Sequence, residues 1–231
     1  NGATTHKPGD RVYAAGSVGE GAWGGCYAEQ MLRGADAFLP LPDNISFAQG
    51  AAIGIPYGTA HWALIKRGRA VKGETVLIHG ASGAVGTAAL QIAAAAGITS
   101  IGTAGSQRGL DLVSEQGASH VLDHTQDGYL DAVADLTDGK GPDVILEMLA
   151  NVNLARDMDI AAKFGRIVII GNRGPIEINP REAMMKELDI IGIALPNTSA
   201  EDIAVIHSAL YKGLADGSLN PVIGKELPLA E

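Results

Sequence analysis

The chain has 231 residues, of which 46% are hydrophobic and 19% charged, so it can bury a core and is not a disordered chain. Its formal net charge is −9 and it has no basic run, which disfavours a nucleic-acid or anionic-membrane surface. The single cysteine, Cys26, excludes an internal disulfide and a four-cysteine zinc lobe. We expect a cytoplasmic protein without a membrane span, because no signal peptide begins the chain and the apolar stretch 88–96 is too short to cross a bilayer.

The first 50 residues are predicted to be rich in β-structure. A turn at 7–10 and a glycine-rich loop at 16–25 separate three expected strands, at 11–15, 26–32 and 38–41. Ser46 and Gln49 then have the spacing of a capping box, so we expect a helix to begin after Ser46. The segment 54–56 should break this helix, and a second helix should follow at 57–66.

The stretch 74–97 indicates a nucleotide-binding turn. Residues 75–79 form a short, β-branched apolar run typical of a buried strand, and Gly80, Gly83 and Gly86 precede an alanine-rich helix. The glycines permit a sharp turn, a close approach of the backbone to phosphates and tight packing of helix on strand. The helix N-terminus offers N–H groups and a positive dipole end to a pyrophosphate. A purely structural glycine turn is the alternative interpretation.

From this stretch onward, strands and helices alternate, which predicts an α/β fold with a Rossmann-type, doubly wound parallel sheet. The strands after the first are expected at 100–104, 121–123, 143–147, 166–171 and 188–194, and the helices at 108–116, 130–137, 153–163 and 199–215. Residues 220–229 are predicted to form a return strand that leaves this domain.

The end of the second strand of this sheet favours NADP(H) over NAD. Enzymes that prefer NAD place an acidic residue there, about 20 residues past the glycines, to bind the ribose hydroxyl. No acid stands in 101–108, whereas Ser106 and Arg108 could bind a 2′-phosphate through charge-assisted hydrogen bonds. Alternatively, Arg108 is a solvated residue in the first turn of a helix.

Five segments carry a family resemblance: I-S-F-A-Q-G-A-A-I-G-I-P-Y-G-T-A at 45–60, V-L-I-H-G-A-S-G-A-V-G at 76–86, I-G-T-A-G-S at 101–106, E-M-L-A-N-V-N-L at 147–154 and G-N-R-G-P-I-E-I-N-P-R at 171–181. They resemble the zeta-crystallins, NADPH:quinone oxidoreductases of the zinc-free branch of the medium-chain dehydrogenase/reductase superfamily. The resemblance implies part of a GroES-like catalytic β domain at 1–50, an NADP-binding Rossmann domain at 51–215 and a segment returning to the catalytic domain at 216–231. It also implies that the family's fold continues beyond both ends of this chain.

The resemblance further implies a set of cofactor-binding residues. They are Ser82, Gly83, Ala84 and Val85 for the pyrophosphate, Gly105, Ser106 and His124 for the adenosine half, and Asn153, Ile170, Gly171, Asn172 and Arg173 for the nicotinamide half. Structural interpretations exist for several of these residues. His124 could be a solvated turn residue, Asn153 could be the N-cap of the following helix, and 170–173 could be a plain turn at a strand end.

The implied reaction is hydride transfer to a quinone, which needs little acid–base machinery because the cofactor carries the chemistry and the protein aligns the reactants. Tyr57 and Thr59 match the family's substrate cleft, and a hydrogen-bonding role for Tyr57 competes with simple packing at a helix start. Zinc-dependent relatives carry a cysteine ligand in the turn at 53–57, which has no thiol here, so we expect no catalytic zinc.

Two other functions stay open at this point. The zeta-crystallins also include lens proteins and binders of AU-rich RNA, so the resemblance allows a nucleotide-binding protein without turnover. A related branch reduces activated alkenes. Because the strand at 188–194 is apolar on both faces and ends the sheet, and because the family pairs this edge, we also expect a homo-oligomer, either a dimer or a tetramer.

Overall fold

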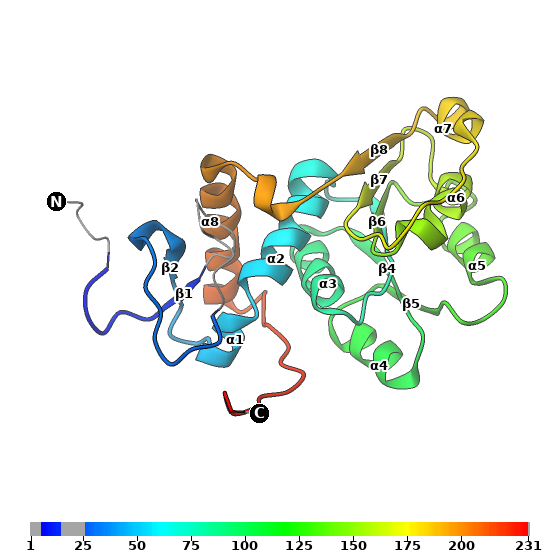
Figure 1. Cartoon of the computed structure of the whole chain (residues 1–231). Helices are drawn as coiled ribbons and strands as arrows, with labels where there is room; N and C mark the ends of the chain where they lie inside the picture. Colours follow the sequence, from blue (N-terminus) through cyan, green and yellow to red (C-terminus); the bar gives the residue numbers. More distant parts are fainter. Residues whose placement is uncertain (1–5, 15–25, 231) are drawn as a thin grey trace. The chain divides into compact units, whose positions relative to one another are not determined.

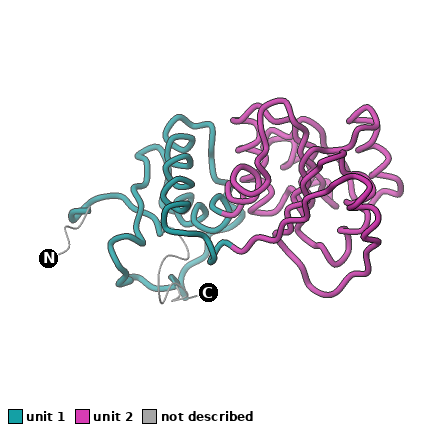
Figure 2. The backbone as a smooth tube through the Cα atoms, turned by 90° about the horizontal axis from the view of Figure 1, so that it is seen from above, with its two compact units in different colours: residues 1–58, 195–231 teal, residues 59–194 magenta. Residues whose placement is uncertain are grey.

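The computed structural model describes residues 6–14 and 26–230 (Figure 1). The chain divides into two compact units, one formed by residues 1–58 with 195–231 and the other by residues 59–194 (Figure 2). These boundaries lie after residues 58 and 194, whereas the domain boundaries predicted from the sequence lie after residues 50 and 215. The predicted glycine-rich loop at 16–25 lies outside the described residues.

The first unit contains a two-stranded antiparallel sheet in which β1 (Val12–Ala14) pairs with β2 (Phe38–Pro40). Its helical elements are η1 (Ala35–Ala37), α1 (Phe47–Ala51), the first part of α2 (Gly54–His61), η3 (Leu195–Asn197) and α8 (Ala200–Asp216). A hydrogen bond of 2.8 Å joins the Tyr13 hydroxyl of β1 to Nδ1 of His207 on α8, and both side chains are buried. This bond therefore connects the two ends of the chain within one unit.

The predicted capping box at the start of α1 is confirmed. Ser46 Oγ accepts a hydrogen bond from the Gln49 N–H at 3.1 Å, and Gln49 Oε1 accepts one from the Ser46 N–H at 3.0 Å. The second helix begins earlier than predicted, at Gly54, because Pro56 lies in its first turn, where a missing N–H leaves no helical hydrogen bond unmade. A π-helical turn, η2 (Trp62–Arg67), continues α2.

Two strand predictions are wrong. Residues 26–32 and 220–229 are irregular, and Tyr27 and Leu32 are almost fully exposed. An alternating or β-branched sequence forms a strand only when its backbone groups pair with a neighbouring strand. The small sheet consists of β1 and β2 and does not extend to either segment.

The second unit contains an entirely parallel six-stranded sheet in the order β5-β4-β3-β6-β7-β8. The strands are β3 (Thr75–Ile78), β4 (Thr99–Ala104), β5 (His120–Asp123), β6 (Val144–Glu147), β7 (Arg166–Ile169) and β8 (Asp189–Gly192). This is the strand order of a doubly wound Rossmann sheet, as predicted. Successive strands are added outward in one direction from β3 and in the opposite direction from β6, so the strand order reverses between these two neighbours. In such sheets ligands bind outside the carboxyl ends of the strands that flank the reversal.

The helices of this unit are α3 (Ala84–Ala96), α4 (Gln107–Glu115), α5 (Tyr129–Leu136), α6 (Ala150–Ile160) and α7 (Pro180–Lys186). Right-handed crossovers place α3 and α4 on one face of the sheet and α5 and α6 on the other, because the chain moves in opposite directions from the two central strands. Of these helices, α7 was not expected from the sequence; Asn179 caps it and Pro180 occupies its first position.

One hydrophobic core cluster of the second unit lies between the sheet and the helices α5 and α6. Leu77, Ile101, Ile145 and Ile167 come from four adjacent strands and pack with Met158 of α6, and all five are fully buried. Burial of each such side chain contributes roughly 1.5–3 kcal/mol to the free energy of folding. The central strands therefore give rigid support to the residues at the carboxyl edge of the sheet. Within the described part of the chain, every helix is too short or too polar to span a bilayer.

Candidate functional site at the carboxyl edge of the parallel sheet

The glycine turn connects β3 to α3 in the way the sequence predicts. Gly80 has a φ of +58°, a left-handed conformation that favours glycine, and its N–H donates to Thr103 Oγ1 of β4 at 3.2 Å. The start of α3 packs so closely on the turn that a Cβ at Gly86 would lie 2.5 Å from Ala81 Cα. Only glycine fits at this position, and the packing fixes the direction in which the helix leaves the turn.

The N-terminus of α3 is open. Gly83 is its N-cap and has no side chain to bond the first-turn N–H groups, and no acidic residue lies in that turn. Gly83 and Ala84 are exposed, with Ser82 and Val85 half-buried on either side. The backbone N–H groups of the first helical turn have no intrahelical acceptor, so this end of α3 suits an anion such as a diphosphate.

The residues predicted for the adenosine half lie together next to this turn. A Cβ placed on Gly105 would lie 2.6 Å from His124 Nε2, so the end of β4 and the segment after β5 are in contact. A Cβ on Gly109 would lie 3.2 Å from both Ser82 Oγ and Ser106 Oγ, which brings the pyrophosphate turn close to the start of α4. Ser106 also caps α4 by accepting a hydrogen bond from the Gly109 N–H at 3.2 Å.

The structure places Arg108 as its alternative interpretation describes, and its contact with a 2′-phosphate stays a prediction. Arg108 is exposed in the first turn of α4, and no acidic residue lies in that turn. The nearest acidic residue on the neighbouring strand, Asp123, accepts hydrogen bonds from the Thr125 hydroxyl and N–H and from Gln126, which lower its pKa. These hydrogen bonds hold the Asp123 carboxylate, in its ionised form, within its own turn.

The residues predicted for the nicotinamide half lie at the ends of β6 and β7. The Ile170 N–H donates to the Glu147 carbonyl at 2.9 Å, and the Arg173 N–H donates to Asn151 Oδ1 at 2.9 Å. A Cβ on Gly171 would lie 2.2 Å from the Met148 carbonyl oxygen, so this position requires glycine. Asn172 and Arg173 are exposed at the rim, and all four predicted residues of 170–173 follow the end of β7.

The interpretation of Asn153 as a helix N-cap is wrong. The helix α6 begins at Ala150, so Asn153 lies inside its first turns and its backbone N–H donates to the Leu149 carbonyl at 3.3 Å. The helix starts in the turn directly after β6, where the Glu147 side chain accepts a hydrogen bond from the N–H of the N-cap residue, Leu149, and no side chain caps the N–H groups of the first turn. The Asn153 amide donates to the same oxygen, Glu147 Oε1, at 3.3 Å.

A buried group of ionisable side chains below the sheet edge was not recognised in the sequence. His79 directly follows β3, Glu147 ends β6 and Asp157 lies on α6; we call them the His79 cluster, and their exposed fractions are 4%, 0% and 0%. His79 Nε2 lies 2.8 Å from Asp157 Oδ1 and 3.6 Å from Glu147 Oε2. A signal existed in the sequence, because apolar strands that end in a histidine and a glutamate place charge at a buried strand end.

The His79 cluster does not fit a catalytic zinc. Its ligand atoms lie within 4.8 Å of one another, yet all three side chains are buried, whereas a catalytic zinc keeps a position open to water or substrate. Cys26 is exposed in the other unit, and the turn at 53–57 has no thiol. The absence of a catalytic zinc therefore stays a prediction.

The two residues predicted to be catalytic lie on α2. Tyr57 and Thr59 have exposed fractions of 2% and 8%. Their burial suits the packing role considered above for Tyr57, and their role in a reaction stays a prediction.

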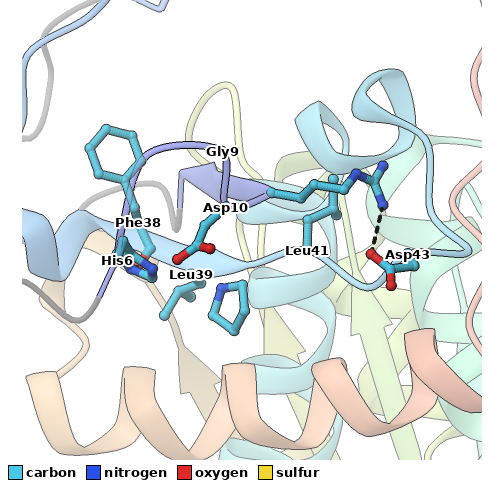
Figure 3. Close-up of a pocket in the computed structure, with 9 residues that line it drawn as sticks. His6, Gly9, Asp10, Phe38, Leu39, Leu41 and Asp43 are labelled. Carbon is cyan, nitrogen blue, oxygen red and sulfur yellow. Dashed lines mark hydrogen bonds and ion pairs between the residues drawn. The ribbon is translucent and has the colours of Figure 1, made fainter.

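The first unit has an open pocket of about 680 Å³ between its N-terminal segment and β2 (Figure 3). Its polar groups already have partners: His6 Nε2 contacts the Phe38 carbonyl at 2.9 Å, and Arg11 bonds the Pro42 carbonyl at 2.7 Å and lies 3.8 Å from Asp43. None of the residues predicted to bind the cofactor lines this pocket. We therefore assign the candidate site to the sheet edge and not to this pocket.

Known proteins resemble the chain in sequence and in fold. The zinc-binding dehydrogenase family matches residues 84–209. A quinone oxidoreductase of Homo sapiens is 44% identical over 227 residues, which cover 98% of this chain and 68% of that protein. A quinone oxidoreductase of Mus musculus is 47% identical over 226 residues, which cover 96% of this chain and 66% of that protein.

A solved structure agrees with these relatives. The Escherichia coli quinone oxidoreductase complexed with NADPH has a TM-score of 0.73 to this chain at 26% identity, covering 82% of this chain and 60% of that one. The chain thus spans about two thirds of the length of the curated relatives it matches. The chain belongs to the zinc-binding dehydrogenase family and, within it, to the quinone oxidoreductases.

Proposed function

We propose that the chain binds NADPH along the carboxyl edge of its parallel sheet and is the cofactor-binding part of an NADPH:quinone oxidoreductase. The observation that carries the proposal is the open N-terminus of α3 behind a glycine turn, at the reversal of the strand order. Similarity to quinone oxidoreductases, one of them solved as a complex with NADPH, supports it.

In this proposal, three parts of the edge bind three parts of the cofactor. The first turn of α3 binds the diphosphate through backbone N–H groups, and Ser106 and Arg108 bind the adenosine 2′-phosphate. The rim formed by Asn153 and residues 170–173 binds the nicotinamide half. When bound, NADPH supplies the hydride, and a quinone that also takes one proton becomes the hydroquinone.

Hydride transfer requires little from the protein beyond aligning NADPH with the quinone and excluding water. The described residues fit this role, because the ionisable cluster at the edge is buried and internally hydrogen-bonded and so cannot reach a quinone as a proton donor. Contacts of Tyr57 and Thr59 with the substrate, including a hydrogen bond from Tyr57, are part of the proposal on the family resemblance alone.

Two measurements test the proposal on the purified protein. Titration with NADPH and with NADH should show tighter binding of NADPH, and tighter binding of NADH would contradict the assignment of the 2′-phosphate site. Steady-state assays with 9,10-phenanthrenequinone and with an enone should show reduction of the quinone. Turnover of the enone alone would favour an alkene reductase, and NADPH binding without turnover of either would favour a catalytically silent binding protein.

The same proposal includes a homo-oligomer and a cytoplasmic location. β8 is an edge strand, its backbone is unpaired on one side among the described strands, and Ile190 on it is partly exposed. Pairing of two β8 edges across a two-fold axis would extend the sheet. Light scattering of the purified protein should give a dimer or tetramer, and a monomer at micromolar concentration would contradict this part.

A further inference from the structure

The His79 cluster lies at the point where the strand order reverses. β3 and β6 are the neighbours on either side of the reversal, and His79 and Glu147 stand at their carboxyl ends, with Asp157 reaching the same place from α6. The His79 N–H also donates to the Leu146 carbonyl at 3.1 Å, so the cluster joins the two strands through the backbone as well. Whatever binds at the reversal therefore lies directly above these three side chains.

Two carboxyl oxygens of the cluster need a hydrogen-bond donor. Glu147 Oε2 and Asp157 Oδ2 are buried and have no donor among the described residues. Two ionised carboxylates without donors would be strongly unfavourable at such a buried position. A proton on one carboxyl makes that group a hydrogen-bond donor, and the ligand atoms of the three side chains lie within 4.8 Å of one another, so the other carboxyl is the neighbouring acceptor.

The geometry indicates which carboxyl carries this proton. His79 Nε2 is 2.8 Å from Asp157 Oδ1 but 3.6 Å from Glu147 Oε2; with the imidazole proton placed on Nε2, His79 donates to Asp157 and favours its ionised form. Burial is the main cause that raises the pKa of each carboxyl to about 7, and the interaction between the two carboxyls raises the pKa of Glu147 and lowers that of Asp157. The proton therefore belongs on Glu147.

The remaining charged and titratable neighbours agree with this assignment. Burial lowers the pKa of His79, so its imidazole is neutral and donates a single N–H. The positive charge of Arg156, exposed on α6, lowers the pKa of Asp157, and the pKa of Tyr129 on α5 is raised chiefly by burial, with smaller contributions from the two carboxylates. None of these groups donates a hydrogen bond to Glu147 Oε2 or Asp157 Oδ2.

The other oxygen of Glu147 acts on the rim of the site. Glu147 Oε1 accepts the hydrogen bond from the Leu149 N–H that begins α6 and the hydrogen bond from the Asn153 amide. The same residue's backbone carbonyl accepts from Ile170 at 2.9 Å and Gly171 at 3.2 Å. One residue thus holds both segments that are predicted to form the nicotinamide wall.

We propose that Glu147 is a positioning residue for the cofactor: it shares one proton with Asp157 and thereby fixes the turn into α6 and the orientation of the Asn153 amide. Loss of that proton places two negative charges below the rim and disturbs the contacts of Oε1. This inference rests on the proposed function, because it assumes that Asn153 contacts bound NADPH.

The test uses variants that separate positioning from folding. Glu147→Gln retains an acceptor for Leu149 and Asn153 and replaces the shared proton by an amide donor, so it mimics the protonated residue at every pH. Glu147→Ala removes both the acceptor for Leu149 and Asn153 and the shared proton. Asn153→Ala removes the amide that Glu147 is proposed to orient toward the cofactor. Asp159→Asn is the matched control, since this exposed carboxyl lies on the same helix two residues beyond Asp157.

We expect Glu147→Ala and Asn153→Ala each to weaken NADPH binding about tenfold, the loss of one hydrogen bond, and the double variant to weaken it no further. Wild-type affinity should fall as the pH rises through about 7, whereas Glu147→Gln should lack this step and Asp159→Asn should keep it. Fully additive losses of affinity in the double variant would overturn the proposal. A wild-type pH profile of NADPH affinity in Glu147→Gln would also overturn it, and this measurement does not depend on the stability of Glu147→Ala.

Infrared spectroscopy provides a readout without cofactor. Below pH 7 the wild-type protein should show a buried protonated-carboxyl band that Glu147→Gln lacks and Asp159→Asn retains. Absence of the band, or a stoichiometric divalent metal in the purified protein, would overturn the proton assignment. If wild-type protein fails to bind NADPH, the proposed function fails while the infrared result still decides whether Glu147 holds the proton.

Discussion

Replacing Gly86 by alanine tests whether tight packing of α3 on the glycine turn shapes the diphosphate site. The added Cβ would lie 2.5 Å from Ala81 Cα, 2.6 Å from its carbonyl oxygen and 2.7 Å from its carbonyl carbon. All three are backbone atoms, so the turn itself must move. Overpacking of this kind costs about 1–3 kcal/mol, while alanine in a helix is favoured over glycine by about 1 kcal/mol.

We therefore expect Gly86→Ala to lower the free energy of unfolding by up to about 2 kcal/mol and the Tm by up to about 8 °C. NADPH affinity should fall at least about tenfold, because the N–H groups of the first turn of α3 lose their alignment. Gly58→Ala is the control for stability: this helical glycine has the flexible Leu195 side chain as its nearest neighbour at 3.5 Å, so alanine should be neutral or stabilising. Equal stability and unchanged NADPH affinity of Gly86→Ala would refute the reasoning.

Three further predictions concern single side chains. Arg108→Ala should weaken NADPH binding about tenfold, as expected for one charge-assisted hydrogen bond at an exposed site, and leave NADH binding unchanged in parallel titrations; an equal loss for both would contradict the 2′-phosphate contact. Burial lowers the pKa of His61 to about 4, so its neutral form stabilises the fold above the unfolded pKa and this stability is lost as pH falls from about 6.5 to 4. Denaturant unfolding across this range should show a loss of up to about 3 kcal/mol that His61→Gln lacks, and identical profiles would contradict it. Ser46→Ala should lower the free energy of unfolding by about 1 kcal/mol through loss of the capping box, whereas no change would show that the Gln49 N–H finds water instead.

The parts of the fold that the sequence predicts well are those with a strong local signal. The run 75–79 and the glycines after it define β3 and the turn, and the alternation beyond them gives the Rossmann order. The adenosine residues are brought together as expected, since Gly105 and His124 follow adjacent parallel strands that end at the same edge. Parallel order alone is enough to make that prediction.

Predictions fail where distant parts of the chain decide the structure. The segments 26–32 and 220–229 have strand-like sequences but no pairing partner in the described sheets. The helix α7 is a different case, because its start could have been predicted locally: Asn179 and Pro180 are typical of an N-cap and a first helical position. The His79 cluster could not be found by spacing, since its members lie 68 and 10 residues apart and meet only when β3, β6 and α6 pack together.

A crystal structure of the protein with NADPH tests the central claim most directly. The account predicts the diphosphate at the N-terminus of α3, within hydrogen-bond distance of the backbone N–H groups of Ala84 and Val85, with the 2′-phosphate beside Arg108. Density for the cofactor at another place, or a glycine turn closed by neighbouring side chains in the complex, would contradict it.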